Sequence, residues 1–210
     1  SDIPVSIVLS DPSGNVSGTF TTAISQTSDA IDANAPTVAS VSVADGTYKI
    51  GDTVAVTITA TGNETGLTLS SATFNGQTLT GINDVGDGTY TATYTVVETD
   101  ADIADGGTVT TSLAFTDVAG NVGAATTSVT LAAESIDANA PTVTVVSIPD
   151  AAMKVGDTVT ATITVSGATG ETLSLESSTI GGFALGSLSK TDDTTYTATF
   201  TVADGGADVA

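Results

Sequence analysis

Apolar and polar residues alternate along several segments of the chain. Val54, Val56 and Ile58 alternate with threonines, and Tyr90 and Tyr94 follow the same two-residue rhythm further on. Alternation of this length predicts β-strands with one buried face, and threonine suits the exposed face of a pleated sheet. We find no segment with the period of a helix. Within one stretch of the chain we expect strands at 37–43, 53–61, 67–74, 77–82, 89–96, 108–115 and 123–132.

The sequence repeats itself with a period of about 105 residues. "GDTVAVTITATG" (51–62) returns as "GDTVTATITVSG" (156–167), and "DGTYTATYTV" (87–96) returns as "DTTYTATFTV" (193–202). About seven short strands in each period predict a two-sheet antiparallel sandwich of immunoglobulin size. The expected fold is therefore all-β, made of tandem immunoglobulin-like antiparallel β-sandwiches.

The repeats are out of step with the two ends of the sequence. The opening "SDIPVSIVLSDPSGNV" aligns with 107–122, and the closing "VADGGADVA" aligns with 96–104. The alignment predicts the last two strands of a preceding repeat, then one complete repeat, then the first five strands of a following repeat. The corresponding boundaries are 1–31, 32–136 and 137–210.

Neither incomplete unit buries its apolar residues alone, because a two-strand ribbon is marginally stable and a five-strand remnant exposes its core. We expect neighbouring copies of the same repeat as partners, either in one continuous chain or by strand donation between chains. The residues expected to meet are Ile3, Val5, Ile7 and Leu9 on one side and Tyr196, Ala198, Phe200 or Val202 of another copy on the other.

The charge of the chain is strongly negative. There are 24 acidic residues, three lysines and no arginine, which gives a net charge of −21. Nucleic acids and anionic membrane surfaces require basic faces, so neither is an expected partner, whereas cations are. No apolar run is long enough for membrane insertion. The chain has no cysteine, so disulfides play no part in its fold.

The sequence offers little for catalysis. It has neither histidine nor cysteine, which excludes nucleophile–histidine triads and histidine-based metal sites. A pair of carboxylates can hydrolyse a glycoside, but nearly all acidic residues fall in expected loops and no aromatic-lined cleft accompanies them. We therefore expect no enzymatic activity.

Four motifs give the chain a family resemblance. These are "DVAGNV" before the last strand, "GDTVTATITV" and "DGTYTATYTV" within strands, and "IDANAPTV" at the junctions. Together they resemble bacterial immunoglobulin-like repeats that form the stalks of giant repeats-in-toxin-type adhesins and biofilm surface proteins. The resemblance covers the whole chain. It implies a mechanical role outside the cell, at the bacterial surface, often with calcium stiffening the joints between domains.

Calcium is the cofactor that the residues themselves favour, because it takes six to eight oxygen ligands. Asp100 and Asp102 lie in a loop that should face the junction residues Asp137 and Asn139, and Glu171 should approach from the next sandwich. The D-x-D spacing places two carboxylates on one side of an extended chain. The corresponding candidates at the other junctions are Asp32, Asn34, Glu64, Asp204 and Asp208.

Two alternatives stay open at this point. The acidic residues can simply be solvated loop and turn residues, since Asp and Asn favour turns for reasons unrelated to metals. The "D-x-x-G-N" loops at Asp11–Asn15 and Asp117–Asn121 are expected to close by side-chain to backbone hydrogen bonds.

Instead of forming a stalk, the sandwiches can also bind a glycan or protein through their loop tips, although these loops contain few aromatic residues.

Overall fold

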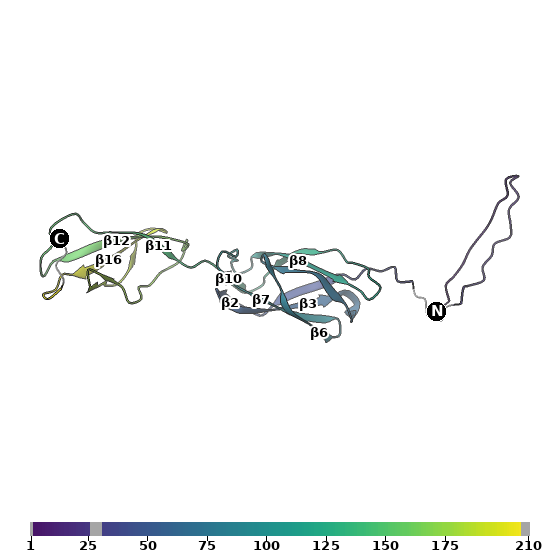
Figure 1. The fold of residues 1–210 in the computed structure, drawn as a ribbon, viewed down its shortest axis with the longest axis horizontal. Helices are drawn as coiled ribbons and strands as arrows, with labels where there is room; N and C mark the ends of the chain where they lie inside the picture. Colours follow the sequence, from purple (N-terminus) through teal and green to yellow (C-terminus); the bar gives the residue numbers. More distant parts are fainter. Residues whose placement is uncertain (1, 26–30, 207–210) are drawn as a thin grey trace.

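The computed structural model describes residues 2–25 and 31–206. It contains an N-terminal ribbon (residues 2–25), a middle sandwich (residues 31–140) and a C-terminal sandwich (residues 141–206), arranged end to end with the ribbon and the C-terminal sandwich at opposite ends (Figure 1). The regular elements of these described ranges are strands, apart from one 3-10 turn at Thr61–Asn63. Among the described residues, no helix has the length and apolar character needed to cross a membrane.

The middle sandwich consists of two four-stranded antiparallel sheets. The first has the order β1 (Val38–Val43), β3 (Thr53–Ala60), β7 (Thr89–Thr95) and β6 (Thr80–Gly86). The second has the order β5 (Gln77–Thr78), β4 (Thr68–Phe74), β8 (Thr108–Thr116) and β9 (Thr126–Thr130). This is the strand arrangement of an immunoglobulin-type sandwich, and it confirms the predicted all-β fold.

The alternating residues form the core between these two sheets. Val54, Val56 and Ile58 of β3 are completely buried, and the Tyr90 ring of β7 packs on Phe115 of β8 with ring centroids 4.7 Å apart. The threonines between them face outward, as the two-residue period requires. The aromatic residues therefore supply the bulk of a core that has neither tryptophan nor cystine.

One predicted strand divides in two. The segment at 77–82 was expected to be continuous, but β5 pairs with β4 whereas β6 pairs with β7 in the opposite sheet. Buried Leu79 lies at the crossing point. The two-residue period does not reveal such a crossing, because Leu79 and Ile82 are too few apolar positions to assign the segment to one sheet.

The end of the middle sandwich also differs from the expected linker. β10 (Glu134–Asp137) pairs in parallel with β2 (Gly46–Lys49), outside the two main sheets. The segment "ESID" that begins the expected junction is thus a strand of the middle sandwich. Its single apolar residue, Ile136, is too short a signal for a period to be recognised.

The C-terminal sandwich repeats the first sheet but not the second. One sheet has the order β11 (Thr142–Ser147), β12 (Thr158–Ser166), β16 (Thr195–Thr201) and β15 (Ser189–Lys190). A small hairpin, β13 (Thr179–Ile180) and β14 (Phe183–Ala184), corresponds to β4 and β5. Within the described residues, no strand of this sandwich corresponds to β8 or β9.

The N-terminal ribbon is an isolated antiparallel pair of extended segments. Bridges join Ile3 to Ile24, Ile7 to Phe20 and Ser10 to Val16. Its described backbone hydrogen bonds all lie within the ribbon. The two predicted partial units, 1–31 and 137–210, include positions outside the described ranges.

Candidate functional site

The joint between the two sandwiches is the part of the molecule where the sequence places its candidate residues. The joint segment comprises residues 134–141. It begins with β10, where Ile136 and Ile103 exchange two backbone hydrogen bonds of 2.8 Å. Ile136 and Ala138 are 3% and 0% exposed. The first half of the joint segment is therefore packed into the middle sandwich.

The second half of the joint segment is held by hydrogen bonds to the loop after β7. The Ala138 N–H donates to Asp102 Oδ1 (2.8 Å), and the Ala140 N–H donates to Glu98 Oε1 (3.2 Å). The Ala138 carbonyl accepts from the Thr99 N–H (3.1 Å). β11 begins at Thr142, so only Pro141 lies between the last anchored residue and the next strand. The joint is consequently very short.

Close packing also limits the joint on its other side. Gly167, in the loop after β12, has a φ of +77°, and a Cβ placed there would lie 2.8 Å from the carbonyl oxygen of Ala140. A side chain at this position would therefore displace the end of the joint segment from the loop after β12. Glycine permits both the left-handed conformation and the approach.

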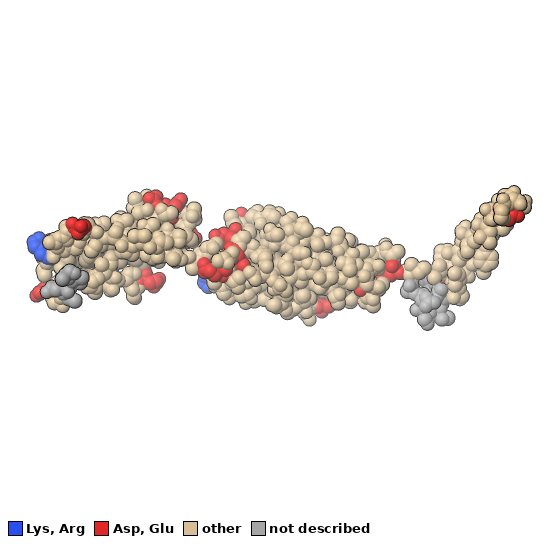
Figure 2. All heavy atoms as spheres, turned by 45° about the horizontal axis from the view of Figure 1, so that its top comes forward, with Lys and Arg blue, Asp and Glu red and all other residues tan. Residues whose placement is uncertain are grey.

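Acidic residues from both sandwiches face the joint. Burial raises the pKa of Glu171, and the negative charges of Asp137 and Asp102 raise it further, against the opposing effect of Lys190. Figure 2 shows acidic side chains gathered at the end of the middle sandwich that faces the C-terminal sandwich. Glu171 thus lies within electrostatic range of Asp137 and Asp102.

These carboxylates do not form a preassembled metal cluster. Among residues 2–25 and 31–206, no three acidic, histidine or cysteine residues are grouped so as to hold a metal ion. Asp102 already accepts the hydrogen bond from Ala138, and Asp137 Oδ1 accepts from the Asn139 N–H at 3.4 Å. The described donor set therefore falls short of the oxygen shell that calcium takes.

Asp100 is not directed at the joint. It is 7% exposed, and its carboxylate accepts hydrogen bonds from the Tyr94 hydroxyl (2.6 Å), the Val97 N–H (3.0 Å) and the Gln77 amide (2.6 Å). Burial acts to raise its pKa, but these hydrogen bonds outweigh it and hold the pKa of Asp100 below the ordinary value. Asp100 thus stabilises its own sandwich from within.

The remaining candidates are spread over the surface. The Asn34 N–H donates to Asp32 Oδ1 (3.1 Å), as Asn139 does to Asp137. Glu64 and Asp204 are exposed, and no contact joins either to another predicted ligand among the described residues. Asp208 lies outside the described residues.

The two "D-x-x-G-N" loops close on themselves, which confirms that prediction. The Asn15 N–H and side-chain amide donate to the two oxygens of Asp11 at 2.8 and 2.7 Å. Asn121 makes the equivalent bonds to Asp117 at 2.8 and 2.9 Å. Hydrogen bonds from these asparagines are the main reason that the pKa values of both aspartates lie below the ordinary value.

Sequence reasoning missed the polar network around Asp100, although the repeats contain a signal for it. Gln77, Tyr94 and Asp100 of the middle sandwich align with Phe183, Phe200 and Gly206 of the C-terminal one. All three positions change together, from a hydrogen-bonded group to two aromatic rings and a glycine.

Comparisons with known proteins place the chain among sandwich repeats. The family model described as bacterial Ig-like domain matches residues 32–133 and again residues 137–210. The search of curated proteins gives no match. A solved structure of FdeC, an Escherichia coli adhesin, is 19% identical with a TM-score of 0.43, over 96% of this chain and 66% of the FdeC chain. A TM-score of 0.43 is too low to support an argument, so the family assignment rests on the two matches to the family model.

Proposed function

The chain belongs to the family of bacterial Ig-like domains, and we propose that it is a non-catalytic structural repeat of a large extracellular bacterial adhesin or surface filament. In this role the sandwiches act in series as a stalk, which separates a binding domain from the cell surface. The two family matches in tandem support such an arrangement.

The observation that carries this proposal is the construction of the joint. A stalk transmits position only if its joints resist bending, and here the joint segment is bound to the middle sandwich as far as Ala140. Proline at position 141 adds a restricted φ to the single residue left between the anchored segment and β11. A binding module on a flexible tether needs none of these contacts.

The net charge favours separation of neighbouring stalks. With −21 charges and few lysines, neighbouring stalks repel one another. The repulsion is screened over about 8 Å at physiological ionic strength, so it acts between stalks that approach closely. Such repulsion keeps parallel stalks apart without any specific contact.

We propose calcium as an additional stiffening element at the joint, separate from the contacts described above. Asp102, Asp137 and Glu171 come from three chain segments, and the pKa of Glu171 is raised by burial and, in addition, by the negative charges of Asp137 and Asp102. A divalent cation binding there would remove this repulsion. Because the described carboxylates are not grouped as ligands, binding would require them to move together.

Small-angle X-ray scattering in solution tests the stalk. The chain should give a rod-like profile whose cross-section is that of one sandwich. Insertion of a Gly-Ser-Gly-Ser segment after Pro141 should make the scattering profile less rod-like. The added residues lie outside the anchored part of the joint, so they should allow it to bend. A profile that already indicates free bending in the unaltered chain would contradict the proposal.

A further inference from the structure

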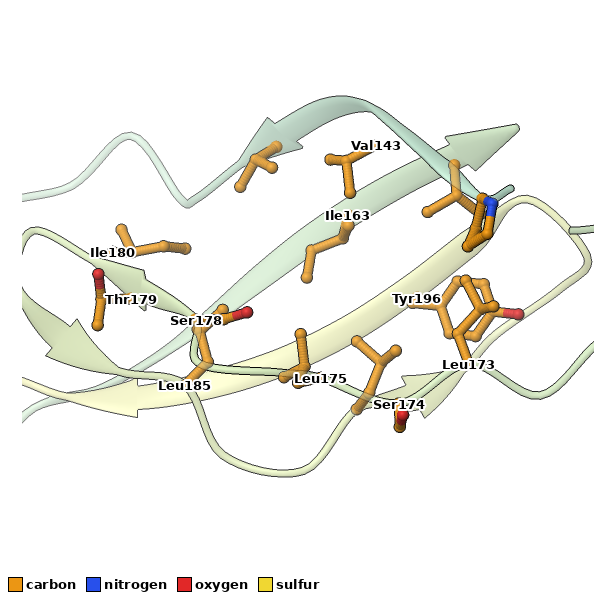
Figure 3. A pocket seen from close by; sticks show the side chains of 14 residues that line it. Val143, Ile163, Leu173, Ser174, Leu175, Ser178, Thr179, Ile180, Leu185 and Tyr196 are labelled. Carbon is orange, nitrogen blue, oxygen red and sulfur yellow. The ribbon is translucent and has the colours of Figure 1, made fainter. Parts of the chain in front are cut away.

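The C-terminal sandwich carries an open apolar groove. Its volume is about 340 Å³, and it is lined by β11, β12 and β16 and by the segment at 173–188 (Figure 3). Val143 and Val146 on its rim are 59% and 50% exposed. Their counterparts in the middle sandwich, Val38 and Val41, pack against the core. Within the part of the chain that the structure describes, no strand covers this side of the sandwich interior.

The middle sandwich shows what covers the same surface. There β8 lies against the core, with Leu113 and Phe115 0% exposed and Phe115 paired with Leu69 of β4. The C-terminal counterparts of Tyr90 and Leu69 are Tyr196 and Leu175, and both line the groove. The C-terminal sandwich thus contains the residues against which a covering strand would pack.

In the described ranges, no strand pairs with the backbone at 174–177 beside the groove. β4 has seven residues, whereas its counterpart β13 has two. The difference falls at 174–178, the segment equivalent to the part of β4 that pairs with β8. An extended segment with no ladder partner leaves N–H and C=O groups available for another strand.

The N-terminal ribbon has the geometry of the missing strands. Its bridges Ile7–Phe20 and Ser10–Val16 fall at the positions of Leu113–Thr126 and Thr116–Val122 in the β8–β9 pair. The residues equivalent to Leu113 and Phe115 are Ile7 and Leu9, which are 50% and 68% exposed. The ribbon is thus already paired in the required way, with its apolar face uncovered.

We propose that the groove binds the N-terminal ribbon of a second copy of this chain. Leu9 of the second copy lies on Tyr196 beside Leu175, Ile7 lies opposite Ser178, and 5–9 pairs antiparallel with 175–180. Because groove and ribbon are different surfaces at opposite ends, the contact is head-to-tail and builds a filament. This inference deepens the proposed stalk function and rests on it.

One position makes the fit imperfect in a way that can be tested. Gly123, in the segment after β8, lies very close to the Pro36 carbonyl. A Cβ could be placed at Gly123 only if the neighbouring atoms moved. The ribbon has Ser17 at this position, next to Pro141 of the acceptor. Ser17→Gly should therefore strengthen the association, whereas Gly18→Ala, at a neighbouring open position, should leave it unchanged.

Disulfide trapping tests the contact directly, since the chain has no cysteine of its own. Chains with Leu9→Cys are mixed with chains with Leu175→Cys under mild oxidation and separated on a non-reducing gel. Paired positions in antiparallel strands have the separation that a disulfide needs. We expect a heterodimer band from this mixture and none when Ser13→Cys, at the tip of the ribbon, replaces Leu9→Cys.

Sedimentation of the unmodified chain gives the second measurement. Association should increase with concentration and with monovalent salt, which screens the repulsion between copies. Leu9→Asp should abolish association, whereas Thr21→Asp, on the face of the ribbon opposite to Ile7 and Phe20, should not. Both variants should retain the melting transition of the middle sandwich. The inference would be overturned if the chain stayed monomeric at every concentration. It would also be overturned if the cysteines introduced by Leu9→Cys and Leu175→Cys formed a disulfide only within one chain that carries both. Neither result would affect the stalk proposal, which scattering tests on the monomer.

Discussion

Phe183 stacks on Phe200 in the C-terminal sandwich, with parallel rings whose centroids are 5.9 Å apart. In the middle sandwich the same two positions hold Gln77 and Tyr94, which both donate hydrogen bonds to the buried carboxylate of Asp100. Asp100 is replaced by Gly206, where a side chain would collide with the Phe183 ring. The two sandwiches thus fill the same end of the core differently, one with a hydrogen-bonded carboxylate and the other with two stacked aromatic rings. Each arrangement involves all three positions.

Tyr94→Phe should destabilise the middle sandwich. It removes the hydrogen bond from the Tyr94 hydroxyl and leaves a buried carboxylate short of a donor, which costs roughly 1–3 kcal/mol. Urea unfolding followed by circular dichroism measures the change. Tyr48→Phe is the matched control, because the Tyr48 hydroxyl bonds to the Ala44 carbonyl in an exposed setting. An equal loss in both variants would contradict the role of Asp100.

Exchanging all three positions should be less harmful than the single changes indicate. The variant Gln77→Phe, Tyr94→Phe, Asp100→Gly places the C-terminal solution in the middle sandwich. Because the three residues contact one another, their effects should not add, and the triple variant should lose less stability than the sum of the singles. Strict additivity in the same urea experiment would show that the positions are independent.

The stability of the middle sandwich should depend on pH through Asp100. Its pKa is lower in the folded chain than in the unfolded chain. The ionised carboxylate therefore contributes its full stability above the unfolded value of about 3.9, and this contribution is lost as the pH falls through the folded pKa. Asp100→Asn should reduce the fall in unfolding free energy between about pH 5 and pH 2. An unchanged slope would contradict the assignment.

Glu171→Gln should stabilise the joint region at neutral pH when calcium is absent. The raised pKa of Glu171 means that its ionised form is disfavoured in the folded chain, by burial and by Asp137 and Asp102. Removal of the charge should therefore raise the melting temperature of the C-terminal sandwich in chelator. Glu176→Gln, an exposed acid in the same sandwich, is the control.

The same pair of variants tests the calcium proposal. With free calcium at 100 times the dissociation constant, one site adds about 2.7 kcal/mol to the folded state. The unaltered chain and Glu176→Gln should both melt at higher temperature in calcium than in chelator, and Glu171→Gln should respond less. Equal melting in calcium and chelator for the unaltered chain would exclude calcium as a stiffening element at this joint.

The sequence contains enough periodic signal to predict the sandwich fold and most strand positions. Thr53–Ala60 and Thr89–Thr95 were predicted almost to the residue, because buried and exposed positions alternate along the whole of each strand. The approach of Glu171 to Asp102 and Asp137 follows from the order of strands, which determines the loops that face each joint.

Other features depend on contacts that no local pattern encodes. Asp100 and Asp102 are equivalent in a sequence motif, yet one is buried against Tyr94 and the other binds the backbone of the joint segment. Both follow a turn in which Thr99 has a φ of +76°, a conformation that the sequence motif does not reveal. Likewise, β10 is a strand because β2 offers it an edge, and its own sequence gives little sign of this.

The central claim is that protein contacts alone hold the two sandwiches in a defined arrangement. Pulsed electron paramagnetic resonance between spin labels at Ala55→Cys and Thr160→Cys, exposed positions on β3 and β12, measures the distance distribution across the joint. Labelled chains are diluted with unlabelled chains, in chelator. We predict one narrow peak, which Asp102→Ala broadens by releasing the Ala138 N–H and which Asp105→Ala in the same loop leaves unchanged. A broad distribution in the otherwise unaltered chain, or no effect of Asp102→Ala, would contradict the account.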